Sequence, residues 1–173
     1  MKRGKSKKSQ SAFGMSFGMI FSIILIIFFI VVAFIAIRAF LNAKKCAQVG
    51  IFVDEFQTEV DKTWNSQSSS FEFRGRLPTK IEYVCFADLD ESITATRDIK
   101  YIGDELGVYQ GNIANMFFYP TNYACNMVYH EIDHLDINNI ILEKNNPYCI
   151  VVNAGNIDIQ IEKDFNEKLV SIE

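Results

Sequence analysis

Residues 17–37 read FGMIFSIILIIFFIVVAFIAI, and this run decides how the rest of the chain is organised. It contains no charged residue, and 16 of its 21 residues are Ile, Leu, Phe or Val. Insertion of such a run into a bilayer is favoured by about 5 to 10 kcal/mol before end effects. As a helix it spans about 31 Å, the thickness of the hydrocarbon core. The alternative is a buried core helix, which the remaining chain is too short to cover on all sides. We therefore predict a transmembrane helix over residues 13–41.

The charges on either side of this run indicate its orientation. The tail of residues 1–12 carries five Lys or Arg and no acid, and basic residues beside a first span stay on the cytoplasmic side. Three more, Arg38, Lys44 and Lys45, follow the run. All 21 acidic residues lie after residue 42, and with 11 Lys and Arg there they give a net charge of −10. We expect a cytoplasmic tail, an extracytoplasmic domain, and the lipid bilayer as a partner of the anchor. The acidic charge of the domain argues against nucleic acid or anionic lipid as its partner.

A cleaved secretory signal is the other interpretation of an N-terminal apolar run. Signal peptides have an apolar core of about 7 to 15 residues, followed by a small-x-small cleavage site. The present run is longer, and no such site follows Ile37. We therefore expect a single-pass protein of the cell membrane that keeps its anchor.

Beyond Ile37 the apolar residues become periodic, which predicts an amphipathic helix over residues 42–65. They recur at every third or fourth position, as Cys46, Val49, Val53, Phe56, Val60 and Trp64. No proline occurs before Ser70, so one helix is expected to continue from the membrane into this segment. We expect the apolar stripe to pack on a sheet that includes Ile157, Ile159 and Ile161. The alternative is a coiled coil, which requires a longer seam with a 3.5-residue repeat.

Residues 71–173 have the alternating pattern of strands, and they predict a β-rich domain. A hairpin is expected from strands 149–152 and 157–161 around the turn Asn153–Asn156. A short helix is predicted on Ile99, Ile102 and Leu106. The other predicted strands are 71–75, 81–86, 116–119 and 169–172. The fold class is therefore α+β, with one long N-terminal transmembrane-plus-amphipathic helix followed by a small antiparallel β domain.

Cysteines and glycines give further expectations. All four cysteines, Cys46, Cys85, Cys125 and Cys149, follow the apolar run. An even number outside the cytoplasm favours two disulfides, with three possible pairings, and four buried thiols are the alternative.

Near the start of the run, Gly14 and Gly18 form a Gly-x-x-x-Gly pair, which allows close helix–helix packing. Both glycines are candidates for self-association, and lipid-facing glycines are the alternative.

The sequence His130-Glu131-Ile132-Asp133-His134 fits the pattern His-Glu-x-x-His. On a helix, two histidines at this spacing bind zinc and the glutamate polarises a water molecule, as in the zincin metalloproteases. A membrane-anchored zinc metalloprotease is therefore the alternative function, and a structural metal site of Cys125, His130 and His134 is a second one. The flanking sequence does not favour a helix, and the remaining candidate for a third protease ligand is Glu162. We expect both histidines to be exposed on a strand through Leu135 and Ile137.

No other pattern commits the chain to catalysis, and we expect neither an enzyme nor a cofactor. The acidic residues Asp88, Asp90 and Glu91 lack the glycine and glutamate of an EF-hand loop, so a solvated loop is expected. The leading hypothesis is a single-pass envelope protein that acts by self-association, as a homo-oligomer, or by binding a partner on the cell surface.

A basic leader, an unbroken apolar helix, its amphipathic continuation and a disulfide-bearing β domain together resemble type IV pilins and related archaeal pilin-like proteins. The segment Lys7-Lys8-Ser9-Gln10-Ser11-Ala12 is similar to the stretch where such leaders are cut. The resemblance covers about 65 residues. It implies cleavage near Ser9 and assembly through residues 12–37 as a filament core. The glutamate usual at the fifth mature position is replaced here by Gly14.

Overall fold

The computed structural model describes the backbone of residues 12–173 and the side chains of residues 18–96 and 99–173. Most of the basic tail, up to Ser11, lies outside the described residues, and so does the expected cleavage site near Ser9. The chain divides into two units between Ala43 and Lys44. The second unit, residues 44–173, is called the head.

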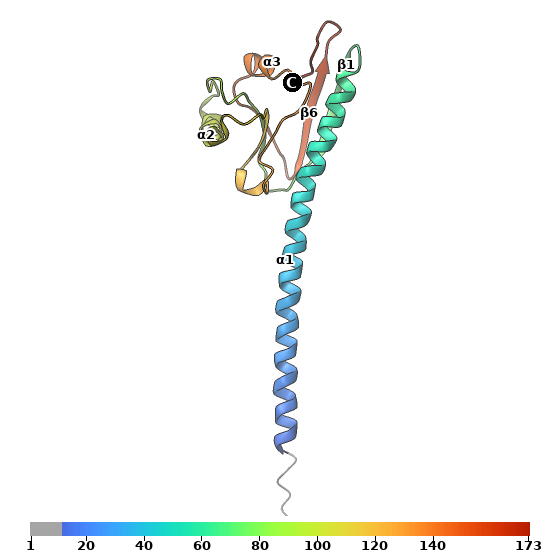
Figure 1. Ribbon diagram of the computed structural model, residues 1–173, viewed down its shortest axis with the longest axis vertical. Coiled ribbons are helices and arrows are strands. Elements are labelled where there is room, and N and C mark those ends of the chain that lie inside the picture. The colour runs from blue at the N-terminus through green and yellow to red at the C-terminus, as the bar shows by residue number, and fades with distance from the viewer. Residues whose placement is uncertain (1–11) are drawn as a thin grey trace, which may run out of the picture. The chain divides into compact units, whose positions relative to one another are not determined.

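Helix α1 runs from Ala12 to Trp64 and has 53 residues (Figure 1). From Gly18 to Ala43 every described side chain is exposed. Within the described chain, α1 is the helix that is long and apolar enough to cross a membrane. It ends where Asn65 and Ser66 hydrogen-bond to its last carbonyl groups: Asn65 Nδ2 donates to Asp61 O, and Ser66 Oγ donates to Thr63 O. These bonds satisfy acceptors that a helix terminus leaves without an intrahelical partner.

The head contains two antiparallel sheets, one with the strand order β1-β6-β7 and one with the order β4-β3-β2-β5. This arrangement confirms the predicted α+β class. The strands are β1 (Ser69–Arg76), β2 (Tyr83–Phe86), β3 (Met116–Tyr119), β4 (Tyr129–His130), β5 (Tyr148–Val151), β6 (Asn156–Lys163) and β7 (Ser171–Ile172). The helices of the head after α1 are α2 (Arg97–Leu106) and α3 (Ile137–Glu143), with 3₁₀ turns η1 (Gly107–Tyr109) and η2 (Thr121–Tyr123).

The four-stranded sheet is covered on both faces. Val84 and Phe118 belong to the cluster that includes α1, whereas Cys85 and Phe117 pack with Ile102 of α2. Figure 1 shows α2 and β6 on opposite sides of the head. Double coverage explains why β2 is apolar at successive positions and does not alternate with a polar face.

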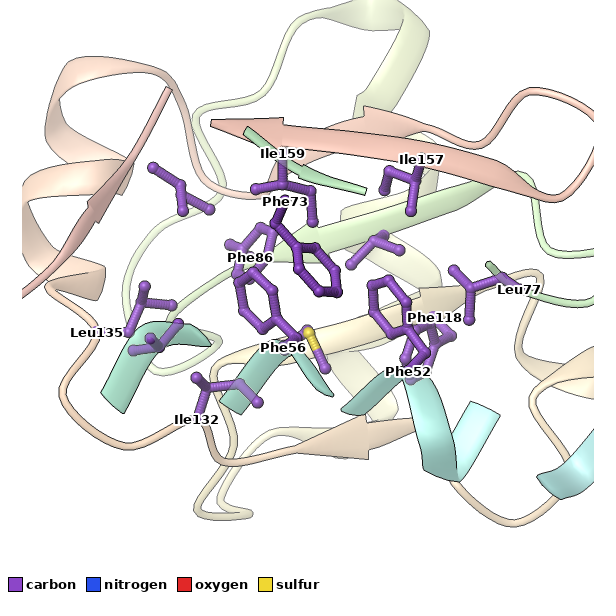
Figure 2. Packing of buried hydrophobic residues seen from close by; sticks show 14 of the residues in the cluster. Phe52, Phe56, Phe73, Leu77, Phe86, Phe118, Ile132, Leu135, Ile157 and Ile159 are labelled. Atoms are coloured by element: carbon purple, nitrogen blue, oxygen red, sulfur yellow. The ribbon is translucent and has the colours of Figure 1, made fainter. Parts of the chain in front are cut away.

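The apolar stripe of α1 forms the centre of the main core, as predicted. Its fully buried members are Val49, Phe52, Phe56 and Val60, and they share one cluster with Ile157, Ile159 and Ile161. Figure 2 shows the rings of Phe52 and Phe56 pointing toward Phe73 of β1 and toward the four-stranded sheet. The centroid of the Phe56 ring lies 5.3 Å from that of Phe73 and 5.7 Å from that of Phe86. The stripe is therefore buried under sheet residues.

The predicted stripe is wrong at one position, Trp64. Trp64 is 36% exposed, whereas Phe52, which the predicted stripe omitted, is fully buried. At about 100° per residue, the buried face that runs through Val60 continues to Thr63 and not to Trp64. Thr63 is 2% exposed. Gly75 of β1 lets this face approach the sheet closely, because a Cβ atom at that position would overlap the Phe52 ring.

The predicted hairpin is also wrong in its pairing. Strands β5 and β6 flank the turn Asn153–Asn156, but β5 pairs with β2 and β6 pairs with β1. A single bridge between Asn153 and Asn156 connects them. The eight-residue ladder of β1 and β6 supplies the backbone partners that a hairpin would otherwise have provided.

A helix replaces the strand expected through Leu135 and Ile137. Leu135 forms one isolated bridge with Val170, and α3 begins at Ile137. Asp136 caps this helix, since its Oδ1 accepts a hydrogen bond of 3.0 Å from the backbone N–H of Asn139. Aspartate is a preferred residue at this position because it satisfies a free donor of the first turn.

Candidate functional site

Two disulfides connect the segments of the head, as expected, and they settle the pairing. Cys46 of α1 is bonded to Cys125, and Cys85 of β2 is bonded to Cys149 of β5. The first bond attaches the start of the head to the segment after η2, 79 residues away. The second joins residues that are directly opposite in neighbouring strands. Disulfides are typical of oxidising compartments.

The His-Glu-x-x-His sequence does not form the helix on which zincins carry their ligands. His130 ends strand β4, and His134 lies in an irregular segment before α3 with a φ of 65°. The two imidazoles also contact different parts of the head, His130 against Phe118 of β3 and His134 against Trp64 of α1. The geometry therefore does not match the metalloprotease arrangement that this pattern requires.

His134 connects the last turns of α1 to the segment of residues 131–136. Its ring stacks on that of Trp64 with a centroid separation of 3.7 Å, and its Nδ1 lies 3.0 Å from Asp61 Oδ1. Gln57 reinforces the contact, because its Nε2 donates to Asp61 Oδ1 and its Oε1 accepts from the N–H of Asp133. Through these contacts His134 holds the segment of residues 131–136 against the end of α1.

His130 is half-buried, and its Nε2 is a buried atom without a hydrogen-bond partner among the described residues. The ring packs edge-on against Phe118, with centroids 5.9 Å apart. Burial lowers the pKa of His130, and a hydrogen bond to the Met127 backbone partly opposes this shift. The uncharged imidazole is the form that suits this environment.

No group of three or more His, Cys, Asp or Glu side chains in the described part of the chain could hold a metal ion. Cys125 is consumed by its disulfide, so it cannot supply a thiolate beside His130 and His134. In the acidic loop, Asp88 Oδ1 accepts a hydrogen bond from the Asp90 N–H, as in a local turn.

A shallow pocket of about 270 Å³ lies between this loop and α3. The buried side chain of Asn146 holds the loop in place, since its Nδ2 donates to Asp88 O and to Ser92 O. The pocket offers hydroxyl, amide and carboxylate groups beside two aliphatic side chains. Its lining residues are Glu91, Ser92, Thr94, Asn138, Ile141, Leu142 and Asn146.

The glycine pair lies near the start of α1. Gly14 is in the first turns of the helix, and a Cβ atom at Gly18 would meet no atom within 4 Å. Ser22, one turn further, donates from its hydroxyl to Gly18 O at 2.9 Å. The surface at Gly18 is exposed, and self-association through Gly14 and Gly18 stays a prediction.

Comparison of the chain with models of known protein families, with curated proteins and with solved structures finds no match.

Sequence reasoning missed the pairing of His134 with Trp64 and the role of Asn146. The first joins residues 70 positions apart, and neither residue carries a local pattern that predicts the contact. The α3 helix had a detectable signal, because Asp136 precedes an apolar pattern at Ile137, Ile140 and Ile141.

Proposed function

We propose that this protein is a single-pass, membrane-anchored envelope protein whose head lies outside the cytoplasm and acts by association. It associates either with further copies of itself or with another protein at the cell surface. The observation that carries the proposal is the contrast between two successive parts of helix α1. Its apolar part is exposed throughout from Gly18 to Leu41, whereas one face of its later part is buried in a head with two disulfides.

Two features support this orientation. The basic tail of residues 1–12 favours the cytoplasmic side, and disulfides persist in oxidising compartments outside it. The two histidines contribute to packing and pairing within the head, and this supports a binding role over the metalloprotease alternative.

Orientation is tested by thiol labelling of intact cells with an impermeant reagent. Two variants that each add one cysteine to the four disulfide-bonded ones, Lys5→Cys and Ser68→Cys, place a free thiol before and after the span. Labelling at position 68 without labelling at position 5 is expected. The reverse pattern would overturn the orientation, and loss of the chain from the membrane on alkaline extraction would overturn the anchor itself.

A pilin-like filament subunit is the more specific form of this proposal. The leader Lys7–Ala12 and the continuous helix α1 support it. The mass of the mature chain in membranes provides the test. Loss of about nine N-terminal residues is the expected result for processing near Ser9, whereas an intact tail would reject the pilin-like form and leave the membrane-anchored protein in place.

A further inference from the structure

Strand β1 lies at one side of its three-stranded sheet, and its free side carries unpaired backbone groups. The strand order is β1-β6-β7, so among the described residues no strand lies on the far side of β1. β1 has eight residues, whereas strands have most often about five or six. A free edge of this length offers backbone donors and acceptors to another strand.

The register of β1 and β6 shows which residues of β1 carry these groups. One residue beyond the ladder and in the same register, the N–H of Leu77 donates to Gly155 O at 2.9 Å. On the other side of β6, the N–H of Glu173 donates to Gln160 O at 3.1 Å. Because hydrogen-bonded and non-hydrogen-bonded pairs alternate along an antiparallel ladder, the odd-numbered residues of β1 bond to β6. The even-numbered residues form what we call the outer edge, and they are Ser70, Glu72, Arg74 and Arg76.

Most of the devices that protect a sheet edge are missing from β1. Proteins block such edges with proline, with a β-bulge, with a very short strand or with a covering helix or loop. β1 contains no proline, and its eight pairs with β6 follow one another without a bulge. All four residues of the outer edge are exposed. The remaining protection is charge, which an added strand of matching charge would neutralise.

The charges of the outer edge favour an acidic partner strand. Arg74 forms ion pairs with Glu72 and with Asp158, so Glu72 already has a partner of opposite charge. Arg76 forms no ion pair with any of the described residues. Cross-strand pairs of opposite charge stabilise a sheet. An acidic side chain on an added strand would therefore pair with Arg76.

A second copy of β1 fits the outer edge less well. In an antiparallel pair of two β1 strands, Glu72 of one copy faces Arg76 of the other in a single register. That register also places the two Arg74 side chains directly opposite each other. Like charges in this position destabilise a sheet, so the outer edge suits a strand from a different protein.

The face of β1 that points away from these charges is apolar. Phe71 packs against the main core and is only partly buried, as is Val53 of α1. Phe73 is 6% exposed. An apolar side chain on an added strand would lie beside Phe71 and remove more of its surface from water. Since successive side chains of a strand point to opposite faces, the matching strand alternates acidic and apolar residues.

We propose that the outer edge of β1 binds an extended segment of a partner protein by strand addition, and that acidic and apolar residues alternate in this segment. Backbone hydrogen bonds to the outer edge hold the segment in place. Its acidic side chains lie beside Arg74 and Arg76, and its apolar side chains lie beside Phe71. This inference rests on the proposed function of the head in association, and it names the surface and the kind of partner.

The test uses the ¹⁵N-labelled full chain in detergent micelles and a capped peptide, as long as β1, in which glutamate alternates with valine. Hydrogen exchange of single amides is followed by NMR. In the free chain, the amides of Glu72 and Arg74 should exchange rapidly, whereas that of Phe73 is protected by β6. At a peptide concentration about ten times the Kd, exchange at Glu72 and Arg74 should slow about ten-fold. A peptide with lysine in place of glutamate is the matched control and should bind more weakly.

A proline on the outer edge tests the backbone contact directly. Arg74→Pro removes a free N–H and no bond to β6, and proline is tolerated at edge positions of this kind. It should weaken peptide binding about ten-fold, because a ladder donor is lost. The matched control Arg74→Thr keeps the donor and should lose less. Slow exchange at Phe73 shows that each variant retains the pairing of β1 with β6.

Charge reversal tests the side chains independently of the backbone. Arg76→Glu should weaken binding of the acidic peptide about five-fold, whereas Lys100→Glu on α2 should leave it unchanged. Absence of protection, equal binding of both peptides, or equal binding to Arg74→Pro and Arg74→Thr would overturn the inference. Protection that increases with the concentration of the chain alone would identify a second copy as the occupant and would also overturn it. The proposed anchor fails by a separate result, the release of the chain from membranes on alkaline extraction.

Discussion

The indole of Trp64 lies flat on the imidazole of His134, with ring centroids 3.7 Å apart and planes inclined by 9°. Trp64 ends helix α1, and its Nε1 donates to Lys168 O. Lys163 Nζ donates to the carbonyl oxygen of Trp64 itself. The last turn of α1 is therefore attached to two segments of the head that are about 70 and 100 residues away in the sequence.

Replacing His134 by alanine should lower the free energy of unfolding by about 1 to 2 kcal/mol, because both the ring stack and the hydrogen bond to Asp61 are lost. Chemical denaturation of the full chain in detergent micelles measures the change. Trp64 is the single tryptophan, so its fluorescence follows unfolding. As a control, His134→Phe keeps the ring stack and should lose less. An alanine variant as stable as the native chain would show that the contact does not stabilise the head.

Phe56→Ala should destabilise the head by about 3 to 5 kcal/mol, since it leaves a cavity in the middle of the aromatic core. Phe56 is fully buried against Phe52, Phe73 and Phe86. The same denaturation experiment applies. Leu142→Ala is a matched control, because Leu142 is 84% exposed and its removal should change stability by no more than about 0.5 kcal/mol. Equal effects of the two variants would contradict the described core.

Proteolysis without reduction should release one peptide pair linked through Cys46 and Cys125 and another linked through Cys85 and Cys149. Mass spectrometry identifies the pairs. Removing either bond by a double Cys→Ser change should lower the free energy of unfolding by about 4 kcal/mol, because the bonds close loops of 79 and 64 residues. Any other pairing, or four free thiols, would disagree with the structure.

Acidification should destabilise the head through His130. Burial lowers the pKa of its imidazole in the folded state below the ordinary value of 6.5. The unfolded chain then binds more protons as the pH falls below about 6.5, so the free energy of unfolding decreases until the pH reaches the lower pKa of the folded state. Urea denaturation between neutral and mildly acidic pH measures this slope. His130→Gln should make the slope shallower, and an unchanged slope would show that His130 is not responsible.

Features that depend on a local pattern of residues can be predicted from the sequence of this chain. The uncharged run of residues 17–37 indicated a helix long enough to span a bilayer, and the absence of proline indicated that the helix continues. The alternation of Ile157, Ile159 and Ile161 predicted strand β6 and its buried face. These signals are readable because helix and strand periodicities repeat within a few residues. The even number of cysteines favoured disulfides but left three pairings open.

Features that depend on contacts between distant segments become visible only in the folded chain. The fold pairs Cys46 with Cys125, assigns β5 and β6 to different sheets, and places His134 on Trp64. The folded chain also shows that the His-Glu-x-x-His sequence is not helical, because β4 ends at His130 and α3 begins only at Ile137. The five residues of this pattern do not determine their own backbone conformation, because it depends on the strand that pairs with β4 and on the residue that caps α3. The pairing of the strands follows from the burial of the aromatic face of α1 against residues of two sheets. The free energy of this burial depends on contacts throughout the head and not on any short segment.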